Sequence, residues 1–150
     1  MRALLDVNVL LALFDPDHPH HAAADLWRTE AYAEGWASCP LTQNGFIRII
    51  SARSYRRPLP IGEAIQLLQW QLVKPGHVFW PDDISLGDPT LFDHGHLLGP
   101  NQITDAFLLA LAVKNGGRLV TFDQSIALGA VRQAEPRHLV TLRASGGATT

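Results

Sequence analysis

Three aspartates occupy positions from which carboxylate chemistry could be built. Asp6 follows the short apolar run Ala3–Leu5, and Asp123 follows the apolar run that begins at Arg118. Asp105 lies in the first turn of an expected helix that is otherwise apolar. Three carboxylates at one edge of a fold repel one another and raise one another's pKa unless a cation lies among them. Oxygen-only ligand sets of this kind suit Mg²⁺ or Mn²⁺.

A divalent cation held by aspartates supports displacement at phosphate. Such a cation lowers the pKa of water and stabilises charge on the attacking and leaving oxygens. Each aspartate also has an ordinary alternative role. An aspartate in the first turn of a helix offsets the helix dipole by about 0.3 to 1 kcal/mol, and an aspartate after a strand commonly caps the next helix. The combination of all three favours the metal site over the three separate structural roles.

The elements that must position these aspartates follow from the apolar pattern. Short apolar runs predict strands at Ala3–Leu5, Trp36–Cys39, Val78–Trp80, Arg118–Phe122 and His138–Leu142. Apolar residues at spacings of 3 and 4 predict helices at Ala22–Ala33, Leu41–Ile50, Ile61–Val73 and Ile103–Val113. This alternation predicts an α/β fold with a mostly parallel sheet and helices on both faces. If the first and fourth strands are neighbours, Asp6 and Asp123 converge at the carboxyl edge of that sheet.

The length and composition predict one globular domain. A chain of 150 residues with 47% hydrophobic and 17% charged residues can bury a single core. We expect the domain to cover residues 1–143 and the small, polar residues 144–150 to form a flexible tail. The sequence has no Gly-x-Ser-x-Gly, P-loop or dinucleotide-binding glycine pattern, so serine hydrolases, P-loop NTPases and Rossmann enzymes lack their defining residues.

Charge and cysteine content restrict the partners and the compartment. Twelve basic and fourteen acidic residues give a net charge of −2, so nucleic-acid binding must be local. The single cysteine, Cys39, fits a reducing compartment. Asp6 comes too early for a signal peptide, and the apolar stretches Val7–Phe14 and Ala106–Val113 are shorter than the roughly 20 residues that span a bilayer. We therefore expect a cytoplasmic protein without a membrane span.

Two further clusters allow a functional and a structural interpretation. The dense basic cluster consists of Arg48, Arg53, Arg56 and Arg57, with Tyr55 among them. It is either an RNA-backbone groove with an aromatic for stacking, placed near the carboxylates, or a solvated helix end. The histidines His18, His20 and His21 surround Pro19, and the start of a helix is favoured over a metal site there.

Four segments together resemble the PIN-domain ribonucleases and, more narrowly, the VapC-type toxins of toxin–antitoxin pairs. These segments are Met1–Leu13, Pro40–Arg48, Thr104–Ala106 and Leu119–Asp123, and the resemblance covers residues 1 to about 143. It implies a three-layer PIN-like fold with a five-stranded parallel sheet and a Mg²⁺- or Mn²⁺-dependent endoribonuclease. It also implies a homodimer that a small VapB-like antitoxin inhibits.

The resemblance assigns roles to particular positions. Asp6, Asp105 and Asp123 match the acidic metal ligands, and Asn8 and Thr121 match polar positions beside the metal. The family commonly has a glutamate on the helix after the second strand, where this sequence has Gly45 preceded by Asn44. Asn44 would contribute a neutral oxygen and hold the metal more weakly. Gly45 either leaves room for a fourth carboxylate or is small because another segment packs against it.

Two other functions remain as alternatives to the nuclease. A catalytically weak or inactive PIN-like module would bind RNA or a protein partner, and RNA cleavage that EDTA abolishes distinguishes it from the enzyme. A response-regulator receiver shares the α/β layout, and Asp82 and Asp83 do follow the third strand. The receiver is disfavoured because Val7 and Asn8 follow Asp6 and no lysine follows Lys114.

Overall fold

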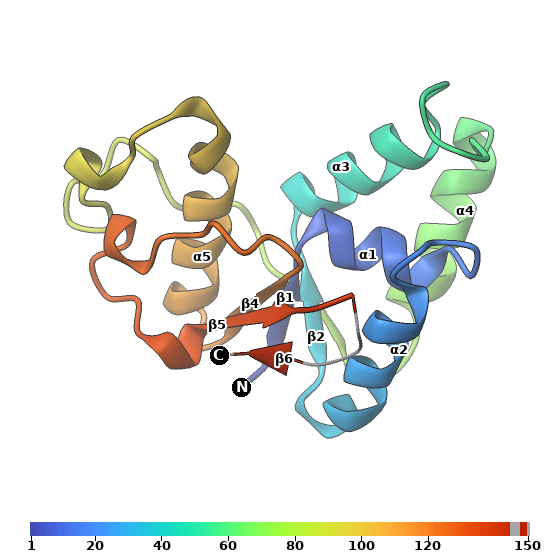
Figure 1. Ribbon diagram of the computed structural model, residues 1–150, viewed down its shortest axis with the longest axis horizontal. Coiled ribbons are helices and arrows are strands. Elements are labelled where there is room, and N and C mark those ends of the chain that lie inside the picture. The colour runs from blue at the N-terminus through green and yellow to red at the C-terminus, as the bar shows by residue number, and fades with distance from the viewer. Residues whose placement is uncertain (145–147, 150) are drawn as a thin grey trace.

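A sheet runs through the centre of the protein (Figure 1). The computed structural model describes residues 1–144, 148 and 149. The strands are β1 (Ala3–Leu5), β2 (Trp36–Ser38), β3 (His77–Phe79), β4 (Arg118–Thr121), β5 (Leu139–Leu142) and β6 (Ala148–Thr149). Their order is β3-β2-β1-β4-β5-β6, with β1 to β5 parallel and β6 antiparallel to β5. The predicted α/β fold with five parallel strands is confirmed.

Helices cover both faces of the sheet (Figure 1). On one side lie α1 (Val7–Phe14), α2 (His21–Glu30), α3 (Pro40–Ile50) and α4 (Ile61–Leu72), and on the other lies α5 (Ile103–Lys114). Within β1, Ala3 and Leu5 join the core under α1 to α4, whereas Leu4 joins the core under α5. Because both faces are covered, β1 is a continuous apolar run without polar alternation.

Short 3₁₀ turns complete the described structure. They span Tyr32–Glu34, His94–His96, Pro100–Gln102, Leu128–Ala130 and Pro136–His138. Within residues 1–144 and 148–149, no helix combines the length and apolar character needed to cross a bilayer. The predicted flexible tail, residues 144–150, lies mostly outside the described residues, and the part that is described adds β6 to the edge of the sheet.

Several elements differ from those expected from the sequence. The run Val7–Phe14 forms helix α1, which the apolar pattern did not separate from β1 because a short, almost continuous apolar run fits a buried strand as well as a buried helix. The second strand ends at Ser38, since Cys39 already caps α3. Helix α2 ends at Glu30, three residues before the expected end, where a 3₁₀ turn leads to Gly35 with a φ of 71°.

The sheet order brings the ends of β1 and β4 together. β1 lies between β2 and β4, so the strand order reverses beside it and its carboxyl end is a site where ligands collect. Leu5 pairs with Val120, and the backbone N of Asp6 donates to Val120 O at 3.0 Å. The first and fourth strands are therefore neighbours in the sheet, as expected.

Candidate active site

Asp6 is a buried carboxylate held in one orientation. Its side chain is 6% exposed and caps the N-terminus of α1. The backbone N of Val7 donates to Oδ1, and the Thr121 hydroxyl donates to Oδ2, both at 2.7 Å. Burial raises the pKa of Asp6 and the charge of Asp123 adds to this, while the bonds from Thr121 and Val7 act in the opposite direction.

Thr121 connects Asp6 to the rest of the site. Its hydroxyl, fully buried, accepts hydrogen bonds from Asn8 Nδ2 at 3.3 Å and from the backbone N of Asp123 at 3.0 Å. Asn8 Oδ1 in turn accepts from the backbone N of Phe122 at 3.2 Å. The structure thus brings Asn8 and Thr121 together with Asp6 and Asp123, as the sequence predicts.

Asp105 and Asp123 lie close enough to shift each other's pKa in opposite directions. Burial, a hydrogen bond with Asp123 and the charges of Asp6 and Asp123 raise the pKa of Asp105 to about 7. The pKa of Asp123 is lowered, chiefly because Ser125 donates to its Oδ1 from Oγ at 2.7 Å and from the backbone N at 2.8 Å. Below about pH 7 a proton in this pair therefore favours Asp105 over Asp123.

Ser125 is a site residue that the sequence analysis missed. The segment Asp123-Gln124-Ser125 forms a local turn in which the aspartate side chain accepts from the residue two positions later. The pattern Asp-x-Ser is the signal that indicates such a turn. Ser125 matters because it keeps Asp123 ionised beside a protonated Asp105.

The site carries negative charge that no cationic side chain neutralises. Among the described residues, no lysine, arginine or histidine forms an ion pair with Asp6, Asp105 or Asp123. The same residues contain no set of three acidic, histidine or cysteine side chains already arranged around a metal ion. The proton that Asp105 holds below about pH 7 offsets part of this charge. A hard divalent ion fits this oxygen donor set on displacing that proton.

Asn44 and Gly45 differ in their surroundings. Asn44 is exposed on α3, and its side chain makes no hydrogen bond to any described residue. Gly45 is buried against α1, where a Cβ at that position would lie 2.7 Å from Val7 Cγ2. Of the two alternatives for Gly45, the structure favours close packing, and the packed group is the side chain of Val7.

The basic cluster lies at the far end of α3 from the carboxyl edge. Helix α3 has 11 residues, which is about 16 Å of length, and the cluster follows its C-terminus except for Arg48. Arg56 donates to the backbone O of Asp17 at 2.6 Å, and Arg57 donates to the Asp17 carboxylate at 3.2 Å. Arg48 and Arg53 are exposed and form no ion pair with any described residue. Arg53, Arg56 and Arg57 therefore do not lie beside the three aspartates, contrary to the expectation from the sequence.

The histidines around Pro19 lie where a helix begins. His20 is the cap residue of α2, and the His21 ring donates to the backbone O of Ala12 at 2.7 Å. Neither belongs to a metal-holding group among the described residues. The structural interpretation of this cluster is favoured.

The proton on Asp105 makes stability depend on pH. Its pKa is about 7 in the folded protein and near 3.8 in the unfolded chain, so the folded state binds the extra proton between these values. Stability that this proton supports is present at low pH and is lost as the pH rises through 7. We expect the metal-free protein to melt at a lower temperature at pH 8 than at pH 5, and Asp105→Asn to reduce the difference. Melting in EDTA at both pH values measures this, and an unchanged difference in the variant would contradict it.

Comparisons with known proteins identify the family of this site. Residues 3–130 match the PIN domain family. The chain is 53% identical over 142 residues to Ribonuclease VapC44 of Mycobacterium tuberculosis, covering 95% of this chain and 100% of that protein. It is 45% identical to Ribonuclease VapC39 of the same organism over 129 residues (85% and 92%), and 41% identical to Ribonuclease VapC38 over 142 residues (93% and 99%). The predicted relationship is thereby confirmed, and the chain belongs to the PIN domain family and, within it, to the VapC ribonucleases.

Proposed function

We propose that this VapC ribonuclease is a Mg²⁺- or Mn²⁺-dependent endoribonuclease that hydrolyses phosphodiester bonds in RNA. Asp6, Asp105 and Asp123 are the proposed metal ligands, with Asn8 and Thr121 as supporting residues. The observation that carries the proposal is the convergence of the three carboxylates, in which Asp105 and Asp123 lie close to the buried side chain of Asp6. A site of this charge, with no cationic side chain paired to it among the described residues, favours a hard divalent cation.

The chain's own residues have distinct tasks in this reaction. When bound, the cation would lower the pKa of water and stabilise negative charge on the phosphodiester oxygens. Thr121 and the backbone N of Val7 keep the Asp6 carboxylate fixed, so it does not need to reorient as charge develops. The hydrogen bonds from Ser125 favour the ionised form of Asp123. Asp105 must lose its proton before its carboxylate adds a negative charge to that of Asp123.

Cleavage of a single-stranded oligoribonucleotide tests the proposal. We expect cleavage with Mg²⁺ or Mn²⁺, none in EDTA, and recovery when the divalent ion is added in excess. The alternative, a PIN-like module that binds RNA or a protein partner without cutting, predicts binding of the oligoribonucleotide with no products under any of these conditions.

Thr121 provides a test of how the site is held. Thr121→Val keeps the shape of the side chain but removes the donor to Asp6 and the acceptor for Asn8 and Asp123. Loss of a partner that orients a metal ligand costs about 10- to 100-fold. We expect kcat to fall within that range while the protein stays folded, and Thr121→Ser to retain most of the activity. Equal activity of the valine and serine variants would show that the hydroxyl does not support the site.

The exposed arginines are proposed to contact the RNA backbone. Arg48 and Arg53 are the better test, because Arg56 and Arg57 already hold Asp17. Each phosphate contact to a single strand contributes about 0.7 to the slope of log K against log salt. We expect Arg48→Ala with Arg53→Ala to reduce this slope by about 0.7 to 1.4, measured by RNA binding at several salt concentrations. An unchanged slope would show that Arg48 and Arg53 do not contact phosphates and are solvated residues at the end of a helix.

The proposed partners are an RNA substrate, a VapB-like antitoxin and a second copy of the chain, all in the cytoplasm. Support for a protein partner comes from a cavity of about 580 Å³ between α2, β2 and the end of α4, away from the aspartates. Trp27, Trp36, Tyr32 and Lys74 are among its lining residues, and Tyr32 is 71% exposed. Exposed apolar groups around such a hollow indicate a surface that a partner covers. Co-purification with the product of an adjacent small reading frame tests the antitoxin, and sedimentation tests the dimer.

A further inference from the structure

Two rings form a tilted pair next to the segment that carries Asp123. The centroids of the His20 and Phe122 rings are 5.1 Å apart, and the ring planes differ by 32°. Phe122 stands in the chain between Thr121, which bonds to Asp6, and the proposed ligand Asp123. The backbone N of Phe122 is fixed by the side chain of Asn8. Both rings are partly exposed, so the pair borders solvent next to the site.

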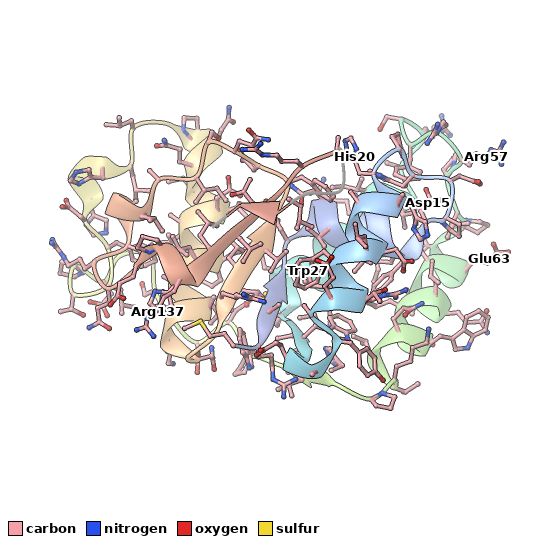
Figure 2. The ribbon with its side chains drawn as sticks, turned by 60° about the horizontal axis from the view of Figure 1, so that its bottom comes forward. Asp15, His20, Trp27, Arg57, Glu63 and Arg137 are labelled. Carbon is pink, nitrogen blue, oxygen red and sulfur yellow. The ribbon has the colours of Figure 1, made fainter. Side chains whose placement is uncertain are left out.

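The segment that carries His20 is fixed by the basic cluster. The Tyr55 hydroxyl donates to the Asp15 carboxylate, and Arg56 and Arg57 both donate to Asp17. Figure 2 labels Asp15 and His20 on this segment and Arg57 on the loop that holds it. His20 therefore reaches Phe122 from a segment that is anchored at two points before it. This arrangement positions the ring without help from a ligand.

The charge of the site makes stacking the favourable way to hold RNA there. The acidic side chains at this edge disfavour contact with phosphates, and no cationic side chain forms an ion pair with them among the described residues. An aromatic surface attracts a nucleobase through its uncharged face, and unpaired bases of RNA are commonly bound in this way. Arg48 on α3 and Arg53 after it can act on the RNA backbone at a distance from the acidic edge.

We propose that His20 and Phe122 form a stacking platform for one unpaired nucleobase of the RNA, next to the bond that is cut. The inference rests on the proposed endoribonuclease function. His20 is the exchangeable half of the platform, since Phe122 also packs against the core under α1 to α4. The platform explains how a strand is held beside the carboxylates and predicts that a base-paired strand binds poorly there.

Fluorescence of 2-aminopurine tests the platform directly. Single-stranded oligoribonucleotides that carry one 2-aminopurine at successive positions are bound to the metal-free protein, in which no cleavage occurs. We expect quenching at one position with the parent chain, no quenching at that position with His20→Ala, and restored quenching with His20→Phe. Loss of a stacked base weakens binding by at least about 5-fold, so the alanine variant should show this increase in Kd.

A matched control separates stacking from a general loss of aromatic surface. Trp70 is 58% exposed on α4, and Trp70→Ala should leave both quenching and Kd unchanged. If the parent chain cleaves RNA and His20→Ala binds and quenches like the parent, the platform is wrong while the nuclease stands. If the parent chain neither binds nor cleaves any RNA with Mg²⁺ or Mn²⁺, the nuclease proposal itself fails and the platform fails with it.

Discussion

Asp105→Asn and Asp6→Asn are each expected to reduce RNA cleavage by more than about 100-fold. Each change removes one carboxylate from the proposed metal ligands, and the loss of such a ligand costs more than the loss of a residue that merely orients it. The fold should remain, because the asparagine keeps the shape of the side chain and removes the burial of charge and the repulsion that raise the pKa of Asp105. Initial rates at saturating Mn²⁺, together with melting temperatures, measure both effects.

An exposed aspartate outside the site serves as the control for these variants. Asp83 follows β3 and pairs with Lys114 at 2.8 Å on the surface. Asp83→Asn should leave the cleavage rate within about threefold of the parent, as surface substitutions usually do. A cleavage rate of Asp105→Asn or Asp6→Asn equal to that of the parent would show that the substituted aspartate is not a metal ligand.

Gly45→Glu is expected to destabilise the protein without strengthening metal binding. A Cβ at position 45 would lie 2.7 Å from Val7 Cγ2, and the carboxylate would be placed in the buried contact between α1 and α3. Overpacking alone costs about 1 to 3 kcal/mol, and an unpaired buried charge adds to this. For a chain of this length we expect the melting temperature to fall by at least about 5 °C.

The chain provides two comparisons for that variant. Gly62 is exposed on α4 with nothing within 4 Å of an added Cβ, so Gly62→Glu should leave the melting temperature unchanged or slightly higher. Asn44→Glu places a carboxylate on the exposed side of α3 at the adjacent position. If Asn44→Glu tightens Mn²⁺ binding, position 44 faces the metal. A stable Gly45→Glu protein would contradict the close packing of α1 on α3.

The positions of the main aspartates could be predicted because they depend on strand order. Asp6 and Asp123 each follow a strand of a parallel sheet, and the pairing of β1 with β4 brings their backbones together. Asp105 could be placed because it lies in the first turn of an apolar helix that leads directly into β4. These three positions follow from the pattern of apolar residues, which determines the layers of an α/β fold.

Other features depend on contacts that the apolar pattern does not contain. Gly45 is small because Val7 packs on it, a contact between two helices that are far apart in sequence. Arg56 and Arg57 bind Asp17 because α1 and α3 pack together. The sequence did not predict that this contact holds the two arginines away from the three aspartates of the site. Helix α1 was missed because its eight residues form a short, almost continuous apolar run directly after β1, which periodicity alone does not distinguish from strand.

Titration of Mn²⁺ into the metal-free protein tests the central claim, that Asp6, Asp105 and Asp123 together hold a divalent cation. Isothermal calorimetry in buffers of different ionisation enthalpy measures binding and the protons released with it. We predict binding by the parent chain with release of the Asp105 proton at pH values below about 7. Binding should be weakened or lost in Asp6→Asn and Asp105→Asn. A parent chain that binds no Mn²⁺, or variants that bind it as tightly as the parent, would contradict the account.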